Sequence, residues 1–140
     1  MIKSYTEKMI ILDSSFIISY RIENDENHER AVKIMIDIAE GNYGIPLISD
    51  YVFDEIITVI FNKAGFSSAV DLGDVLITAP NIYYIDKELF ENSWEIFKNQ
   101  KTKLSFTDCS ILAIMEKESI KNIATFDKDF LKIKDIKVVG

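Results

Sequence analysis

The fold is decided by the stretch Met9-Ile10-Ile11-Leu12-Asp13, in which four apolar residues in a row are followed by a carboxylate. A short apolar run of this kind is typical of a strand that is buried on both faces of a parallel sheet. Further short apolar runs follow at residues 45–48, 82–85, 123–125 and 136–139. Between them, apolar residues recur at helical spacing over residues 27–40, 50–63, 66–77, 87–98 and 106–118. Because parallel strands need crossover connections, this alternation predicts a three-layer α/β/α sandwich with a central, mainly parallel five-stranded sheet.

Length and composition indicate one domain over residues 1–140, since a typical domain has about 100–200 residues. The single cysteine, Cys109, excludes an intramolecular disulfide, and no thiolate zinc motif is present. The apolar runs are far too short to span a membrane, and the N-terminus has no signal-peptide pattern. We therefore expect a cytoplasmic protein without a membrane partner.

The net charge of −7 argues against a nucleic-acid partner, but its distribution is uneven. Residues 1–97 carry 7 Lys and Arg against 17 Asp and Glu, a balance of −10. Residues 98–140 carry 9 Lys against 6 Asp and Glu, a balance of +3. These lysines are equally well explained as solvated helix faces, so the charge does not decide the class of partner.

Two helix starts have a local cause. Ser49 can cap the helix that begins at Asp50, and the spacing of Ser105 and Asp108 matches a capping box with Asp in place of Glu or Gln. In the helix over residues 50–63, Glu55 lies at the border of a wide apolar face. A carboxylate in that position points toward the edge of the core, which suggests a specific role.

Acidic residues follow two of the predicted strands. Asp13 comes after the first strand and Asp127 after the fourth, and ligands of open parallel sheets bind at the carboxyl ends of the strands. Asp108 opens a helix, where its simplest role is to meet the positive helix end. That helix can also bring its N-terminus to the same edge of the sheet. Together with Glu55, these acids would form an all-oxygen site, which Mg²⁺ and Mn²⁺ prefer.

Four motifs in this order resemble those of PIN-domain proteins, VapC-like toxins and stand-alone PIN nucleases in particular. The first is Leu12-Asp13-Ser14-Ser15, and the second runs from Ser49 through Glu55 to Gly65. The third is Ser105-Phe106-Thr107-Asp108-Cys109-Ser110, and the fourth is Thr125-Phe126-Asp127-Lys128-Asp129-Phe130. No single motif is specific, but the four together span about residues 9–139.

The resemblance implies a ribonuclease that depends on Mg²⁺ or Mn²⁺ and hydrolyses RNA phosphodiester bonds. It also implies a homodimer and, for the toxin branch, a small antitoxin protein as partner. Carried over by motif, the catalytic and metal-binding acids are Asp13, Glu55, Asp108 and Asp127. The resemblance assigns supporting polar roles to Ser14, Ser15 and Thr107, with Thr125 as a weaker candidate.

Two features depart from the family pattern. Asp129 adds an acid at a variable position of the fourth motif, so it is an additional or alternative metal ligand. Residues 1–8 precede the usual start of the family, so either they form a flexible N-terminal arm or Met9 is an alternative initiator. No basic cluster that would follow an RNA backbone is evident.

Several residues are not assigned a catalytic role. His28 is the only histidine, so it is expected at the surface or at a helix cap, and it leaves Cys109 without a base that could activate it. Phe90, Trp94 and Phe97 fall at helical spacing and are predicted to be core contacts. Asp54 neighbours Glu55 but points about 100° away from it on a helix.

Other classes of protein remain as alternatives. A haloacid-dehalogenase-like phosphatase also begins with an acid after a strand, but it needs a second Asp where this chain has Ser15. A receiver-like domain lacks its acidic pair and its strand-end lysine here. A catalytically inactive PIN fold that only binds, and an RNA-processing nuclease without an antitoxin, are the alternatives within the family.

Overall fold

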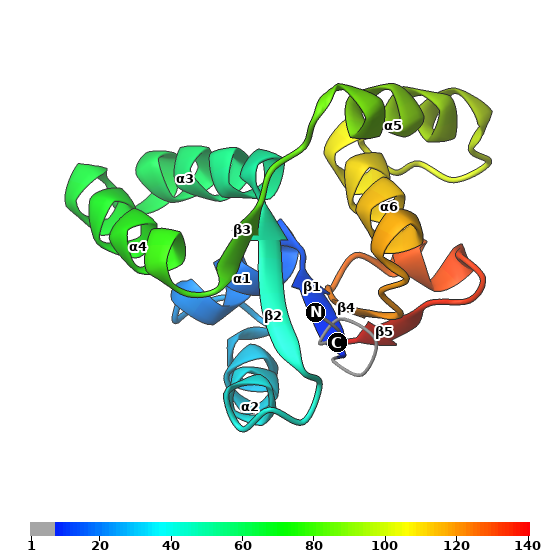
Figure 1. Ribbon diagram of the computed structural model, residues 1–140. Coiled ribbons are helices and arrows are strands. Elements are labelled where there is room, and N and C mark those ends of the chain that lie inside the picture. The colour runs from blue at the N-terminus through cyan, green and yellow to red at the C-terminus, as the bar shows by residue number, and fades with distance from the viewer. Residues whose placement is uncertain (1–7) are drawn as a thin grey trace.

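A computed structural model describes residues 8–140 and contains five strands and six α-helices (Figure 1). The strands are β1 (Met9–Leu12), β2 (Ile45–Ser49), β3 (Asn81–Tyr83), β4 (Asn122–Ala124) and β5 (Lys137–Val139). The helices are α1 (Ser14–Arg21), α2 (His28–Ala39), α3 (Asp50–Ala64), α4 (Phe66–Thr78), α5 (Lys87–Asn99) and α6 (Phe106–Glu118). A short 3₁₀ helix, η2 (Lys128–Lys132), joins β4 to β5. Of the predicted N-terminal arm, residues 1–7 lie outside the described residues.

The strands form one parallel sheet in the order β3-β2-β1-β4-β5, which confirms the predicted fold class. Strand β1 is central: Ile11 pairs with Leu47 of β2 on one side and with Ile123 of β4 on the other. Its residues Ile10, Ile11 and Leu12 are almost completely buried. The residue that follows β1 therefore lies in the middle of the carboxyl edge of the sheet.

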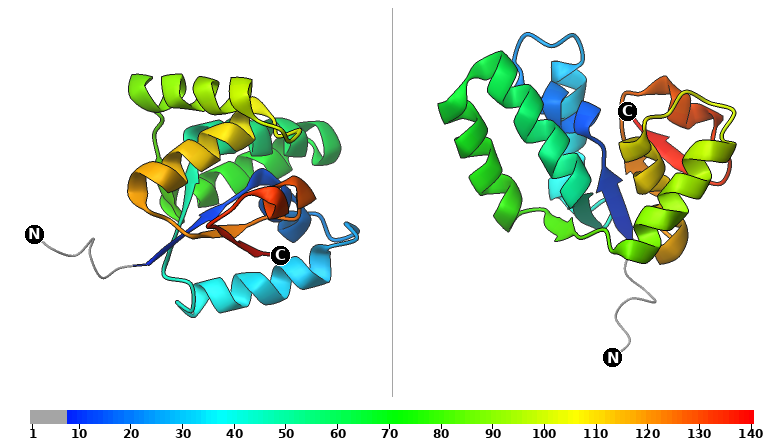
Figure 2. Two further views of the ribbon diagram at one scale, coloured as in Figure 1. Left: turned by 90° about the vertical axis from the view of Figure 1, so that its right-hand side faces the viewer. Right: turned by 90° about the horizontal axis from the view of Figure 1, so that it is seen from above.

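Helices cover both faces of the sheet. Helices α1 to α4 lie on one side and helices α5 and α6 on the other, as the views in Figures 1 and 2 agree. This arrangement follows from the strand order. The chain moves in one direction across the sheet from β1 through β2 to β3, and then crosses back to β4. Because crossovers between parallel strands are right-handed, the connection from β3 to β4, which contains α5 and α6, lies on the opposite face from the first two connections. Helices α3 and α6 both belong to such crossover connections, and both begin near the carboxyl edge of the sheet.

The predicted capping residues are confirmed. The Ser49 hydroxyl accepts a hydrogen bond from the Val52 N–H at 3.1 Å and so caps helix α3. Ser105 and Asp108 form a complete capping box at the start of α6, with 3.0 Å from the Asp108 N–H to the Ser105 hydroxyl. A good N-cap stabilises a helix by about 1 kcal/mol, so both helix starts are set by local sequence.

Two elements were not predicted from the sequence, helix α1 and the 3₁₀ helix η2. Helix α1 has only two turns, and it is stabilised mainly by burying Phe16 and Ile17 in the core. Strands β3 and β4 begin one residue earlier than predicted, and β3 is also one residue shorter than predicted.

The prediction that Phe90, Trp94 and Phe97 are core contacts is wrong. Their exposed fractions are 49%, 48% and 36%, and they form an aromatic cluster around Phe106 with Tyr51 at its edge. The rings of Trp94 and Phe97 are stacked with their centroids 5.7 Å apart. Helical spacing identified the shared face of α5 correctly, but only the tertiary structure shows that nothing in the described chain covers it.

None of the helices in the described part of the chain is long and apolar enough to cross a membrane.

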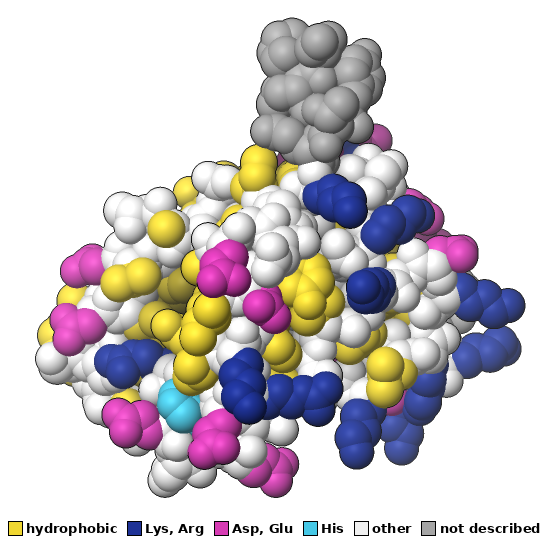
Figure 3. Space-filling model, turned by 90° about the horizontal axis from the view of Figure 1, so that it is seen from below, with side chains coloured by type: hydrophobic (Ala, Val, Ile, Leu, Met, Phe, Trp, Pro, Cys, Tyr) yellow, Lys and Arg dark blue, Asp and Glu magenta, His cyan; other side chains and the backbone are white. Residues whose placement is uncertain are grey.

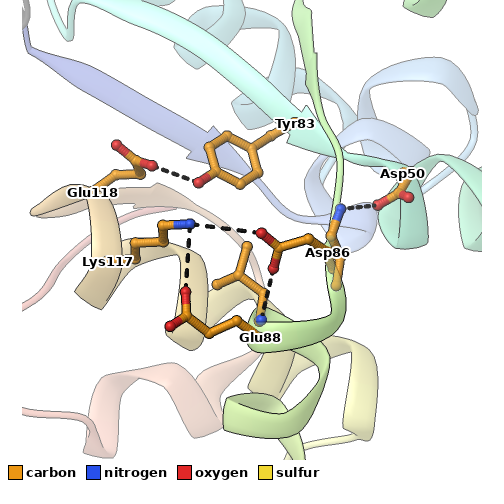
Figure 4. Close-up of polar contacts among 8 residues, drawn as sticks. Asp50, Tyr83, Asp86, Glu88, Lys117 and Glu118 are labelled. Carbon is orange, nitrogen blue, oxygen red and sulfur yellow. Dashed lines mark hydrogen bonds and ion pairs between the residues drawn. The ribbon is translucent and has the colours of Figure 1, made fainter.

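A polar network joins β3 to the end of helix α6 (Figure 4). The Tyr83 hydroxyl donates a hydrogen bond to Glu118 Oε2 at 2.5 Å. Lys117 lies 3.9 Å from both Asp86 and Glu88 at the start of α5. Partial burial, together with the Glu118 contact, raises the pKa of Tyr83 above its ordinary value, so the phenol stays protonated as the donor.

We expect Tyr83→Phe to lower the free energy of unfolding by about 1 kcal/mol, because the substitution removes one hydrogen bond between β3 and α6. Urea denaturation measures the change. The neighbouring Tyr84→Phe is the matched control, since the Tyr84 side chain is well exposed and its hydroxyl has no partner among residues 8–140. Equal stability of the two variants would contradict this role of Tyr83.

Candidate active site

Asp13 occupies the centre of the carboxyl edge, where it ends β1 and begins α1. Its side chain is only 2% exposed. Oδ2 accepts hydrogen bonds from Thr125 at 2.6 Å and from Ser15 at 2.8 Å. Oδ1 is also buried, yet it has no hydrogen-bond partner in the described structure. Burial raises the pKa of Asp13, and Glu55 adds a smaller contribution in the same direction.

Hydroxyl groups tie the ends of the two neighbouring strands together around Asp13. The Ser15 hydroxyl accepts from the Phe126 N–H at 3.0 Å, and the Thr125 hydroxyl accepts from the Asp127 N–H at 3.0 Å. The two hydroxyls also lie 3.2 Å apart. Thr125 is therefore a direct partner of Asp13, although the sequence ranked it below the other supporting residues. Its position between a strand and Asp127 was the available signal.

Glu55 reaches the site from helix α3. The Ser14 hydroxyl donates a hydrogen bond to Glu55 Oε1, which joins the start of α1 to the second turn of α3. The side chain of Glu55 is half-buried, whereas that of Asp54 is exposed. The choice of Glu55 over its neighbour therefore agrees with the direction in which the two side chains point.

Asp108 lies in the first turn of helix α6 and is largely buried. Its Oδ2 accepts from the Ser105 N–H at 3.1 Å, as the capping box requires. Burial, the negative charge of Asp13 and a smaller contribution from Asp127 raise the pKa of Asp108 to about 7. The helix-capping role and a role in the acidic cluster are therefore both fulfilled by this one side chain.

Asp127 follows β4 and its Oδ1 accepts from the Asp129 N–H at 2.9 Å. Asp129 itself is ion-paired, with 3.0 Å from its carboxylate to Lys132 Nζ. Asp127, not Asp129, is among the charges that raise the pKa of Asp108. Thr107 lies beside Asp108, but its side chain makes no hydrogen bond within residues 8–140, and its carbonyl accepts from Ser110 at 2.5 Å.

The charge of Glu55 acts on Asp13, and the charges of Asp13 and Asp127 act on Asp108, so these four acids are linked pairwise as neighbours and are called the acidic cluster below. Asp129 is directed toward Lys132 instead. Within the described residues, no three His, Cys, Asp or Glu side chains are already arranged as a metal-binding group. Each of the four carboxylates also accepts a hydrogen bond from the protein. Asp13 Oδ1 is the buried oxygen that is free to bind a further group.

The protein is thus a parallel α/β/α sandwich domain with buried acids at the carboxyl edge of its sheet. The PIN-domain family model matches residues 10–136, and the chain belongs to the PIN-domain family.

The chain is also similar in sequence to proteins that are named as ribonucleases. The chain is 27% identical over 124 residues to the 23S rRNA-specific endonuclease VapC20 of Mycobacterium tuberculosis. The aligned region covers 87% of this chain and 92% of VapC20. The chain is 25% identical over 122 residues to a VapC ribonuclease of Archaeoglobus fulgidus, covering 86% of this chain and 78% of that protein.

Solved structures share the fold. The crystal structure of VapC20, described as a toxin that cleaves the sarcin-ricin loop, superposes with a TM-score of 0.81 at 22% identity and covers 91% of this chain and 96% of that one. The DNA-bound VapBC of Salmonella typhimurium gives a TM-score of 0.68 at 15% identity, with 94% and 97% covered.

We expect the stability of the metal-free protein to fall as the pH rises from about 4 to about 7. A carboxyl whose pKa is raised on folding binds its proton more tightly in the folded state, and that stabilisation is lost as the proton leaves. Asp108→Asn should therefore reduce this slope and stabilise the protein at pH 8. Urea denaturation with a chelator at several pH values tests this, with the exposed Asp54→Asn as the control for net charge. Equal slopes for wild type and Asp108→Asn would be the contrary result.

Proposed function

We propose that this chain is an endoribonuclease that hydrolyses RNA phosphodiester bonds with the help of Mg²⁺ or Mn²⁺. The observation that carries the proposal is the buried, unpartnered Oδ1 of Asp13 in the middle of the acidic cluster. A buried carboxylate oxygen without a donor is costly unless it binds a further group. The relatives that are named as ribonucleases support RNA as the substrate.

The residues fit a divalent cation. The cluster consists of oxygen donors only, as hard cations prefer, and the repulsion among its carboxylates would be relieved by positive charge. Asp13, Glu55, Asp108 and Asp127 would hold the cation, with Asp129 as an additional candidate. When bound, the cation supplies Lewis acidity and the positive charge that lets a phosphate approach a negatively charged site.

The protein's own side chains prepare this site. Thr125 and Ser15 hold Oδ2 of Asp13 and thereby leave Oδ1 as its free ligand atom. The Ser14 hydroxyl, at the start of α1, donates a hydrogen bond to Glu55 of α3 and so orients its carboxylate. Asp108, with its pKa near 7, can hold a proton on its carboxyl group in the absence of a cation and release it when positive charge is near.

We further propose that the chain acts in the cytoplasm as the toxin of a toxin–antitoxin pair. The structural relative from Salmonella typhimurium is a VapBC protein, and a structure from Klebsiella pneumoniae with the same fold is a toxin–antitoxin complex. A short reading frame for a DNA-binding protein beside this gene would support an antitoxin. Its absence would favour an RNA-processing nuclease.

We expect Asp13→Asn to abolish RNA cleavage while the fold remains intact, because Asn keeps the size of the side chain but removes the charge that a hard cation needs. Glu55→Gln should reduce cleavage by roughly tenfold to a hundredfold or more, because it removes one of the charged oxygen ligands that would hold the cation. The neighbouring Asp54→Asn is the matched control and should cleave like the wild type. The assay is degradation of ribosomal RNA with added Mg²⁺ or Mn²⁺, with and without chelator, and circular dichroism checks the fold.

Cleavage that survives both Asp13→Asn and chelation would overturn the metal-dependent nuclease. A protein that binds RNA but never cleaves it would instead indicate an inactive PIN fold that serves only as a binding module.

We also propose that the chain forms a homodimer through the aromatic cluster of Phe90, Trp94, Phe97, Phe106 and Tyr51. Aromatic side chains are enriched in the buried centres of protein interfaces, and a contiguous exposed apolar patch commonly marks such a site. A two-fold dimer would place this surface against itself. Two rings of the aromatic cluster belong to helix starts: Phe106 is the first residue of α6, and Tyr51 is the second residue of α3. The same two helices carry Asp108 and Glu55 in their first and second turns.

If this surface forms the dimer, Trp94→Ala should shift the protein toward a monomer, because a large aromatic group at the centre of an interface often contributes about 2 kcal/mol or more. Light scattering coupled to gel filtration at micromolar concentration measures the change. Tyr84→Ala, which removes an exposed aromatic side chain outside the cluster, is the control. A wild-type monomer, or a dimer that Trp94→Ala leaves intact, would exclude this interface.

A further inference from the structure

A hollow of about 550 Å³ opens directly beside the acidic cluster, between the start of helix α2 and the 3₁₀ helix η2. It shares Thr125 and Asp127 with the candidate active site. Arg30 of α2 and Lys128 of η2 also line it, and Leu131 adds an exposed apolar side chain. The hollow is therefore continuous with the place where a phosphate would be cleaved.

The two basic residues of this hollow have no Asp or Glu side chain as a partner in the described part of the chain. Within residues 8–140, neither Arg30 nor Lys128 lies in an ion pair with an Asp or Glu side chain, whereas the nearby Lys132 is paired with Asp129 at 3.0 Å. Glu26 is the one acid of the lining besides Asp127. Under the proposed function, a divalent cation bound at the acidic cluster would neutralise the charge of Asp127. The hollow would then hold the positive charges of Arg30 and Lys128 against the one negative charge of Glu26, which favours binding of an anion.

The two basic side chains come from different elements of the fold. Arg30 donates a hydrogen bond to the carbonyl oxygen of Gly140, after β5, and this contact keeps the guanidinium at the wall of the hollow. Lys128 opens η2 immediately after Asp127. On the face shown in Figure 3, most Lys and Arg side chains gather on one side and most Asp and Glu side chains on the other, so the surface is not uniformly acidic.

We propose that this hollow binds the RNA backbone next to the cleaved bond, with Arg30 and Lys128 as ligands of its phosphates. The inference rests on the proposed nuclease function and adds the surface that positions the substrate. A guanidinium can donate two parallel hydrogen bonds to one phosphate, while an ammonium acts as a point charge. Phe126 and Leu131 offer apolar surface to a ribose or a base face. Phosphate contacts of this kind position RNA but do not select its sequence.

The test uses Arg30→Gln and Lys128→Gln, singly and together. Glutamine removes the charge but keeps a hydrogen-bond donor, so the Gly140 contact of residue 30 is not simply lost. Each substitution is made in the protein with its acidic cluster intact. Binding of a fluorescently labelled single-stranded RNA with phosphorothioate linkages, which keep the negative charge and resist hydrolysis, is measured by anisotropy in the presence of Mg²⁺ at several salt concentrations. We expect affinity to fall roughly tenfold for each lost phosphate contact. The slope of log affinity against log salt should decrease by about 0.7 for each contact.

The same two substitutions in the otherwise wild-type protein should raise KM for ribosomal RNA and leave kcat nearly unchanged, because they act on binding and not on the reacting atoms. Lys33→Gln, one turn further along α2, and Lys134→Gln, beyond η2, are matched controls that remove equal charge outside this hollow. Arg30→Lys and Lys128→Arg should restore most of the affinity.

The possible results separate the two proposals. If the wild type cleaves RNA but the hollow variants bind and cleave like the controls, the inference is wrong and the nuclease stands. If no variant cleaves but RNA binding still depends on Arg30 and Lys128, the backbone site is supported and the catalytic proposal fails. If RNA is neither cleaved nor bound, both are overturned.

Discussion

The carboxylate of Asp13 is buried at the end of the central strand, and only one of its two oxygens is satisfied by the protein. Thr125 and Ser15 donate to Oδ2, and each of these hydroxyls also accepts a backbone N–H from the segment after β4. The carboxyl ends of β1 and β4 are thus joined through one acidic side chain. Because Oδ1 is left without a donor, the arrangement is stable at low energetic cost only when positive charge or a proton is close to it. The rest of the site depends on this constraint.

The acids around Asp13 belong to elements on both faces of the sheet. Glu55 comes from α3 on one side and Asp108 from α6 on the other, and Asp127 follows the neighbouring strand. Burial, with a smaller contribution from the charge of Glu55, raises the pKa of Asp13, and burial together with the charges of Asp13 and Asp127 raises the pKa of Asp108. These raised pKa values oppose folding of the metal-free protein near neutral pH and favour a bound cation. The overall charge of −7 is consistent with an RNA partner on this account, since the acidic cluster binds cations while Arg30 and Lys128 beside it remain available to phosphates.

Much of this protein was predictable because local sequence and local structure agree. Apolar runs mark the strands, Ser49 and Ser105 mark the starts of α3 and α6, and the acids follow strands or open helices, so the fold class and the cluster of four acids could be proposed together. The short helix α1 was missed because its stability comes from the burial of Phe16 and Ile17 and not from helix propensity. Thr125 was ranked too low because its partner, Asp13, lies 112 residues away in the chain.

The sequence by itself determined the strand–helix alternation, the helix caps and the identity of the candidate acids, since each depends on periodicity or on neighbouring residues. Only the tertiary structure decided which atoms meet. It showed that Oδ1 of Asp13 is unpartnered, that Asp129 turns to Lys132, and that the aromatic face of α5 is uncovered. It also placed Arg30 and Lys128 at one hollow, although 98 positions separate them in the sequence. The physical reason is that hydrogen-bond partners, burial and charge neighbours depend on distance in space, which a parallel sheet sets through crossovers that bring remote segments to one edge.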